Sequence, residues 1–411
     1  MSTGLTAPLL ARQTAANGGN SQACPEEVNA EEIVVELVPL PVHGELAPEW
    51  RALEEHSDGS FFVSWSWISC WIQSIEDIVD LRLLRAKLHG RSVGLAIFAN
   101  HMERRHRIIR SRTLRLHATG QPALDSITVE CNGFLVDRGM SELVVQRMLR
   151  HVLERERCWD ELVLDGLWST PGWPFSDWQL RAAVTQHANH YVDLDAVRAH
   201  SGGYLALLGS KTRSRIRRSC REYEQLGQVR IELPGDVQQA LEFLEGMKVL
   251  HQKYWVARGE PGSFANAFFE RFHRRLVQDA FGRGEIQLLA IDVGAHRLGY
   301  IYNFLYRGRV YNYQSGLDYH LRENQNRPGL VAHTLAIEHS ARTGQRVYDF
   351  LGGDVEYKQA LGTGVATMAW VVVQRDRLRF KVEAAGRALR NRMSQVRSRN
   401  VSSSTGAEAK K

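Results

Sequence analysis

Acidic, basic and tyrosine side chains gather around a glycine turn near the C-terminal end of this 411-residue chain. Residues 346–358 read RVYDFLGGDVEYK, which predicts a short apolar strand, a turn at Gly352-Gly353 and the start of a helix. Asp349 then lies on the strand, Asp354 at the helix N-cap, and Lys358 one helical turn later. A carboxylate and an amine grouped at a strand end are typical of a site that moves a proton and stabilises negative charge.

Asp349 is the candidate general base of this group, and Lys358 the candidate for stabilising negative charge on a reacting atom. Each has a structural alternative. Asp349 can serve as a cap for the helix that follows, and Lys358 can form an exposed ion pair with Asp354, which contributes little stability.

A second helix start lies about eighteen residues upstream, at Asn326-Arg327-Pro328-Gly329-Leu330. Proline suits the first turn of a helix, and the unpaired N–H groups of that turn bind phosphate, which Arg327 would pair with. We therefore expect Arg327, Gly329 and Leu330 to bind a phosphate-bearing donor. An ordinary Pro-Gly helix start is the alternative.

The run Tyr311-Asn312-Tyr313-Gln314 predicts a strand with the two tyrosines on one face and the two amides on the other. Their polar tips would line a cleft, with Tyr311 contacting the substrate and Tyr313 orienting it. Half-buried sheet surface without a function is the alternative.

Two further groups are candidates for acceptor binding. Arg213 and Arg217 share one helical face, where their mutual repulsion calls for an anion, although Glu222 and Glu224 offer ordinary compensation. In the first half, residues 127–136 predict a strand that places Glu130 and Asn132 on one face, where they would bind acceptor hydroxyls; plain surface polarity explains the same pattern.

Metal chemistry has no support in the sequence, since His101, His106 and His117 lack ligand spacing and no His-Glu-x-x-His occurs. The five cysteines are scattered and form no C-x-x-C pair, which disfavours disulfides and zinc.

No apolar run approaches the roughly 20 residues that span a bilayer, and the first thirty residues do not resemble a signal peptide. We expect a cytoplasmic protein.

A net charge of +6 and a pI near 9.1 indicate an anionic partner: nucleic acid, a lipid surface or a phosphate-bearing small molecule. Much of the positive charge lies in 104–115, 211–221 and 375–411. The last stretch has no aromatic residue after Phe380, so we expect a solvated helix that frays into disorder rather than a nucleic-acid surface.

The length allows two domains, and we predict a disordered leader over 1–30, domains over 31–200 and 205–380, and a basic tail over 381–411. The second half repeats the strand and helix order of the first. Predicted strands are 33–38, 82–88, 93–99, 114–120, 127–136, 161–164, 191–194, 229–233, 286–291, 298–306, 310–316, 347–351 and 366–373. Predicted helices include 50–53, 65–72, 143–153, 213–226, 237–257, 265–280, 330–341 and 355–361.

The order of a Tyr-rich strand, an Arg-Pro-Gly helix start and Tyr-Asp-Phe-Leu-Gly-Gly-Asp-x-x-Tyr-Lys resembles GNAT-related acyltransferases of cellulose and exopolysaccharide biosynthesis, the CelD type. That group is similar in fold to the FemAB peptidoglycan aminoacyl transferases. The resemblance covers roughly residues 205–375 and, more loosely, 45–195. It implies an α+β fold of tandem GNAT-like domains, of which the first is degenerate.

The resemblance also implies the reaction: transfer of an acyl group from acetyl-coenzyme A or another acyl-coenzyme A to an amine or hydroxyl of an anionic, sugar-type acceptor. In this scheme Asp349 deprotonates the nucleophile while Lys358 and Tyr313 polarise or orient the reactants. Tyr357 occupies the place of a family tyrosine, and with Asp354 it would contact the acceptor.

Two other functions stay open. In GNAT enzymes the comparable loop is rich in glycine, whereas the segment 326–330 of this chain contains only Gly329. A donor other than coenzyme A therefore stays open, as in a FemAB-type transferase that uses charged tRNA, which would dock on the basic surface. A catalytically inactive accessory factor of polysaccharide synthesis is the third hypothesis.

Overall fold

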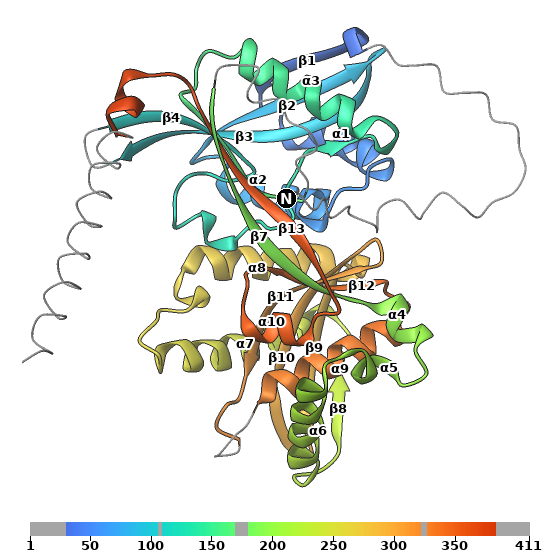
Figure 1. Cartoon of the computed structure of the whole chain (residues 1–411). Helices are drawn as coiled ribbons and strands as arrows, with labels where there is room; N and C mark the ends of the chain where they lie inside the picture. Colours follow the sequence, from blue (N-terminus) through green and yellow to red (C-terminus); the bar gives the residue numbers. More distant parts are fainter. Residues whose placement is uncertain (1–29, 106–108, 169–179, 322–326, 384–411) are drawn as a thin grey trace, which may run out of the picture.

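The computed structural model describes residues 30–105, 109–168, 180–321 and 327–383, so nearly all of the predicted leader and the tail from residue 384 lie outside it. Two lobes are joined by a pair of long strands (Figure 1). Within the described residues, thirteen strands form one sheet. No helix in these ranges is long and apolar enough to cross a membrane.

The first lobe is built on a meander of antiparallel strands. Its strands are β1 (Ile33–Pro39), β2 (Asp80–Leu88), β3 (Arg91–Arg105), β4 (Ile109–Leu116), β5 (Leu135–Val136) and β6 (Glu161–Leu167). Its helices are α1 (His43–Glu55), α2 (Trp65–Ile75) and α3 (Ser141–Glu154), with 3₁₀ turns at Ala30–Glu32, Phe61–Val63, Asp125–Ile127 and Arg138–Met140. The strands predicted at 82–88 and 93–99 are confirmed as β2 and β3, which form a hairpin with Gly90 at a φ of 80° in its turn.

The second lobe repeats this plan. Its strands are β8 (Val229–Glu232), β9 (Ile286–Val293), β10 (His296–Tyr306), β11 (Arg309–Leu317) and β12 (Val347–Gly352). Its helices are α4 (Leu194–Ala199), α5 (Gly203–Leu207), α6 (Ser210–Glu224), α7 (Val237–Val256), α8 (Ala267–Ala280), α9 (Pro328–Arg342) and α10 (Glu356–Leu361), with 3₁₀ turns at Ser263–Ala265 and Phe281–Arg283.

The two lobes exchange their last strands. β7 (Arg181–Asp193) follows β6 in the chain but pairs with β12, whereas β13 (Gly364–Gln374) follows β12 and pairs with β6. β7 and β13 also pair with each other along their length. The sheet order is therefore β1-β2-β3-β4-β6-β13-β7-β12-β11-β10-β9-β8, and each lobe completes the sheet of the other.

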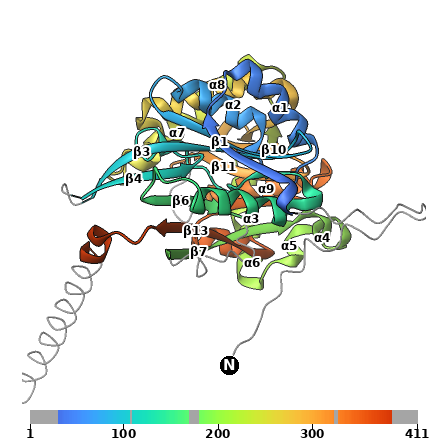
Figure 2. The same cartoon turned by 90° about the horizontal axis from the view of Figure 1, so that it is seen from above.

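Helices cover both faces of this sheet, as the view from above shows (Figure 2). α1, α2, α7 and α8 pack on one face and share a hydrophobic core that spans both lobes. On the other face α3 covers the first lobe, while α4, α6 and α9 cover the second.

The sheet opens between β11 and β12. These parallel strands, linked by the crossover helix α9, pair only through Arg309 to Tyr311 on one side and Val347 to Asp349 on the other. Beyond this point β11 carries a bulge, because Tyr302 pairs with Gln314 while the adjacent Asn303 pairs with Asn312. The bulge at Tyr313 breaks the strict face alternation predicted for 311–314.

Two other local predictions are wrong. Residues 127–136 form an irregular loop with only the two-residue β5 at its end, and Thr128 and Cys131 take left-handed φ values of 35° and 51°, which no strand allows. Helix α10 begins at Glu356, and its N-cap residue is Val355 rather than Asp354, whose carboxylate instead accepts hydrogen bonds from His190 and Gln359.

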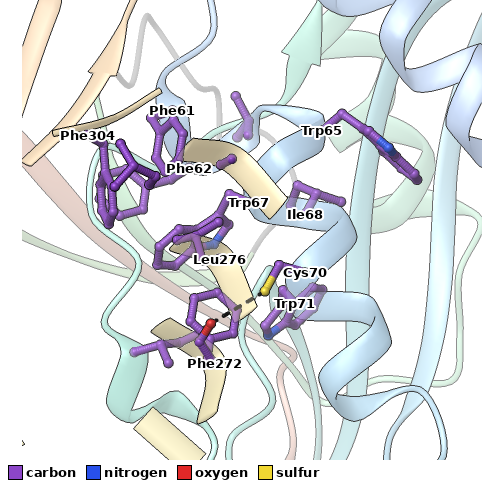
Figure 3. Packing of buried hydrophobic residues seen from close by; sticks show 14 of the residues in the cluster. Phe61, Phe62, Trp65, Trp67, Ile68, Cys70, Trp71, Phe272, Leu276 and Phe304 are labelled. Atoms are coloured by element: carbon purple, nitrogen blue, oxygen red, sulfur yellow. Dashed lines mark hydrogen bonds between the residues drawn. The ribbon is translucent and has the colours of Figure 1, made fainter. Parts of the chain in front are cut away.

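A cluster of aromatic side chains joins the lobes (Figure 3). Trp67 of α2 is fully buried, and its ring centre lies 4.9 Å from those of Phe62 and Phe272 and 5.7 Å from that of Phe304. Phe62 belongs to the first lobe, whereas Phe272 lies on α8 and Phe304 on β10. Rings at these separations attract each other in addition to burying area, so the cluster links the stability of the two lobes.

Replacing Trp67 with alanine is expected to lower the free energy of unfolding by about 3–5 kcal/mol, because a buried ring is lost and a cavity is left. Urea unfolding followed by circular dichroism should show one transition that moves as a whole. Ile78→Ala, at a side chain 61% exposed, is the control and should change the free energy by less than about 0.5 kcal/mol. Two separate transitions, of which only one moves, would contradict the coupling.

Candidate active site

A cavity of about 160 Å³ lies where β11 and β12 separate. Both lobes line it, with Ser126, Thr128 and Glu130 from the first and Ser263, Phe269, Asn312, Tyr313, Gln314, Ser315, Phe350, Leu351, Tyr357 and Lys358 from the second. Pockets that enclose a drug-sized ligand have volumes of about 300–1,000 Å³. This cavity therefore has room for the reacting ends of two substrates rather than for whole molecules.

Glu130 reaches the cavity from the first lobe. Its carboxylate accepts a hydrogen bond from the backbone N–H of Gly352 at the end of β12. Burial raises the pKa of Glu130 to about 7, against the opposing effects of the Lys358 charge and the Gly352 hydrogen bond. A carboxyl group whose pKa lies near neutrality is matched to general acid–base catalysis at physiological pH.

Lys358 lies on the other side of the same turn. Its Nζ donates hydrogen bonds to the carbonyl oxygens of Gly352 and, at 3.3 Å, of Leu351. Burial lowers the pKa of Lys358, while the negative charges of Glu130 and Asp349 act to raise it. The Gly352 peptide groups thus lie between the two side chains, with the N–H bonded to the carboxylate and the C=O to the ammonium.

Asp349 is fully buried behind this turn and does not line the cavity. One carboxylate oxygen accepts a hydrogen bond from Arg309 Nη1 at 2.8 Å, and the other accepts one from the Leu351 N–H at 2.8 Å. The second bond holds Leu351 in a left-handed conformation, with φ at 61°. The geometry of Asp349 is that of a group that shapes the turn carrying Lys358 and Gly352.

The three candidate tyrosines have different surroundings. Tyr313 lines the cavity and donates its hydroxyl proton to the Ile127 carbonyl, and burial raises its pKa well above the usual value. Tyr357 also lines the cavity and stacks on His333 of α9, with ring centres 5.6 Å apart and planes 15° apart. Tyr311 is buried in the sheet opposite Asp349 and is outside the cavity lining.

The start of α9 is close to the mouth of the cavity, since its second-turn residue His333 contacts Tyr357. Pro328 occupies the first turn as predicted, and no side chain caps the helix at Arg327, which is exposed. Gly329 and Leu330 supply first-turn backbone groups beside it. The preceding residues Asn324, Gln325 and Asn326 lie outside the described residues.

The remaining predicted residues are not part of the cavity lining. Asn132 is buried in the first lobe, where its side chain bonds His117 and the Leu116 carbonyl. Arg213 and Arg217 lie on α6, which packs on α9, and Arg217 is exposed. Asp354 is exposed at the start of α10 and bonds His190.

Sequence reasoning expected the polar tips of residues 311–314 to line a cleft, and the two amides, Asn312 and Gln314, do line the cavity. It missed the hydroxyl side chains of the lining: Ser126, Thr128, Ser263 and Ser315. Serine and threonine in loops carry no pattern that points to a site, although Ser315 directly follows the polar run 311–314 and could have been included with it. No group of potential metal ligands occurs among the described residues.

Residues 210–359 match the sequence profile of the family described as Acetyltransferase (GNAT) domain. These residues carry α6, the β11–α9–β12 crossover and Lys358, and thus most of the cavity. A search of curated protein sequences found no significant match.

Two solved structures resemble the whole fold. FemX superposes with a TM-score of 0.53 at 10% identity, over 82% of this chain and 96% of FemX. The C-terminal domain of a candidate lysylphosphatidylglycerol synthetase from Agrobacterium fabrum superposes with a TM-score of 0.50 at 11% identity, over 84% of this chain and 95% of that one. The predicted fold class, an α+β fold of tandem GNAT-like domains, is confirmed, and FemX is one of its structural neighbours. With a GNAT acetyltransferase domain at residues 210–359, this chain is an acyltransferase.

Proposed function

We propose that this chain transfers an acyl group from acyl-coenzyme A to a hydroxyl or amine of a sugar or sugar nucleotide used in cellulose, exopolysaccharide or envelope synthesis. The observation that carries the proposal is the pair formed by Glu130, whose pKa is about 7, and Lys358 on either side of Gly352, inside a domain that matches the GNAT family.

The donor is proposed to enter through the opening between β11 and β12. Its phosphates would bind at the start of α9, where the exposed Arg327 and the positive end of the helix dipole attract anions. Its thioester would then reach the cavity past Tyr357, which links α9 to the cavity wall. A cavity of about 160 Å³ holds a short acyl group together with the acceptor's reacting atom.

Glu130, rather than Asp349, is the proposed general base, because the Arg309 ion pair and the Leu351 N–H already occupy the Asp349 carboxylate. Glu130 takes a proton from the acceptor hydroxyl or neutral amine as its oxygen or nitrogen forms a bond to the thioester carbonyl carbon. The tetrahedral intermediate then breaks its C–S bond, and the departing thiolate takes up the proton held by Glu130.

Negative charge on the carbonyl oxygen needs a stabilising group during this step. The N–H groups of Leu351 and Gly352 are already bonded to Asp349 and Glu130, so they are engaged within the protein. Lys358 is the cation that lines the cavity, and we propose that its ammonium stabilises the oxyanion while Tyr313 positions the loop through the Ile127 carbonyl.

The polar lining of the cavity supports a sugar-type acceptor. Hydroxyl and amide side chains from both lobes surround the cavity beside Glu130, and such groups bind a polyhydroxylated ring. The basic helix α6, with Arg213 and Arg217, packs against α9, and we propose that it binds a phosphate of the acceptor.

Acetyl-coenzyme A is expected to bind in isothermal titration, with enthalpy from charge-assisted hydrogen bonds at the start of α9. Arg327→Ala should weaken binding by about 10–150-fold, since one such bond contributes roughly 1.5–3 kcal/mol. Arg230→Ala, at an exposed ion pair on β8, is the matched control. If neither acetyl-coenzyme A nor longer acyl-coenzyme A binds, the donor is of another class, and charged tRNA is the next ligand to titrate.

Glu130→Gln is expected to lower kcat/KM by about 10²–10⁴-fold, because glutamine cannot accept the proton. In the unmodified enzyme kcat/KM should rise with pH through about 7, since only the ionised carboxylate acts as base. Asp165→Asn, a half-buried carboxyl outside the cavity whose pKa burial also raises, is the control and should keep this profile. Full activity in Glu130→Gln would remove Glu130 from the mechanism.

Lys358→Met is expected to move the rise of kcat/KM with pH by about 1–2 pH units toward higher pH, because the ammonium lowers the pKa of Glu130. Asp349 acts in the opposite direction and is unchanged in this variant. Lys358→Arg keeps the charge and should leave the rise near its original position. A rise that stays in place in Lys358→Met would show that the two groups are not electrostatically coupled.

A further inference from the structure

The first lobe contains the counterpart of the opening that holds the cavity. β4 and β6 are parallel strands that pair only over Thr113 to Arg115 and Glu161 to Val163, as β11 and β12 do over three residues. The first residue pair is Thr113 with Glu161 in the first lobe and Arg309 with Val347 in the second. Counting along each strand from these pairs, Leu116 of β4 corresponds to Asn312 of β11, and Gly166 of β6 corresponds to Gly352 of β12. An opening between β4 and β6 is therefore expected where the second lobe has its cavity.

Asn132 fills this opening. Its backbone N–H donates to the Gly166 carbonyl at 2.7 Å, and its side-chain Nδ2 donates to the Leu116 carbonyl at 3.1 Å. It thus bridges the two separating strands, and it also forms a parallel β-bridge with Leu167. The side chain is only 3% exposed. In the second lobe, by contrast, the Gly352 carbonyl is bonded to the Lys358 side chain beside the cavity.

Hydrogen bonds determine the orientation of Asn132. Oδ1 accepts the Gly133 backbone N–H at 2.9 Å and lies 2.8 Å from His117 Nδ1. His117 Nε2 accepts the Ile97 N–H at 3.1 Å, so the proton of the neutral ring is on Nδ1 and is donated to Asn132. Burial lowers the pKa of His117 to about 4, which keeps the ring neutral at physiological pH. All the polar atoms of the Asn132 side chain are satisfied in one arrangement.

The loop anchored by Asn132 also carries Glu130. Gly166, at a φ of 68°, lies directly against it: a Cβ there would come within 3.0 Å of the Val129 carbonyl and 3.6 Å of Glu130 Cα. Thr128 and Cys131 flank Glu130 in left-handed conformations, which are unfavourable unless the surroundings impose them. The bonds of Asn132 hold this loop together with two others: the Ser60 hydroxyl donates to the Cys131 carbonyl at 2.6 Å, and the Tyr313 hydroxyl donates to the Ile127 carbonyl.

We propose that Asn132 is a positioning residue: it closes the donor opening of the first lobe, which leaves one acyl-donor site per chain, and it anchors the loop that presents Glu130 to the second lobe. This inference rests on the proposed function for the role of Glu130, but the closure and the anchoring are properties of the protein without substrate.

The test uses the full chain without substrate. ¹³C NMR of the glutamate carboxyl groups, with Glu130→Gln to assign the signal, should give a Glu130 midpoint near pH 7. In Asn132→Ala the midpoint should fall by more than one pH unit toward the ordinary value near 4.3, because a released loop exposes the carboxyl to water. Gly166→Ala places a methyl group against the Val129 carbonyl, so it should displace the same loop and lower the midpoint as well.

Thr113→Val is the matched control, since it removes another buried hydrogen bond of the same lobe, the one from Oγ1 to the His101 carbonyl at 3.1 Å. It is expected to lower the melting temperature and to leave the Glu130 midpoint unchanged. An unchanged midpoint in folded Asn132→Ala and in Gly166→Ala would overturn the anchoring role.

Donor binding and turnover test the proposed closure of the donor opening in the first lobe. Acetyl-coenzyme A should bind at one molecule per chain, and in Asn132→Ala kcat should fall about 10–100-fold at an unchanged donor KM, as for other residues that orient a reacting group. Two molecules per chain would overturn the closure. If no coenzyme A ester binds, the proposed function fails, while the NMR result still decides whether Asn132 positions Glu130.

Discussion

Two parallel strands that stop pairing leave backbone N–H and C=O groups without partners, and a buried group of this kind has to find one elsewhere. β12 meets this constraint with side chains. Beyond Asp349, the N–H groups of Leu351 and Gly352 bond carboxylates, and their carbonyls bond Lys358. The proposed base and the proposed oxyanion-stabilising cation are therefore held in place by the same bonds that the open sheet needs in order to fold.

Strand exchange between the lobes makes this arrangement rigid. Glu130 comes from the first lobe, so its distance from Gly352 depends on how firmly the lobes are joined. β7 and β13 pair with each other at eleven positions, and each joins the strands of the opposite lobe. The aromatic core around Trp67 packs across the same junction. A hinge between the lobes would break β-ladder bonds and open a dry core, so the site does not rely on a flexible contact.

The sequence predicted most of the strands and helices, because periodicity and turn residues are local signals. The strands predicted at 82–88 and 93–99 and the helix start at Pro328 are examples. The loop around Glu130 could not be predicted, since its apolar and polar residues alternate as in a strand, and only tertiary contacts impose left-handed φ values on Thr128 and Cys131. The strand exchange leaves no mark on local pattern either.

The two carboxylates show why motif position alone is a poor guide to role. Asp349 lies in the most recognisable segment of the chain, yet its buried carboxylate is paired with Arg309, forty residues upstream, and we propose that it is a structural anchor. Glu130 lies in an inconspicuous loop more than two hundred residues away, where burial raises its pKa to about 7. Environment separates the roles of chemically equivalent groups. In the proposed mechanism, the loop that closes the opening of the first lobe supplies the acid–base group of the second.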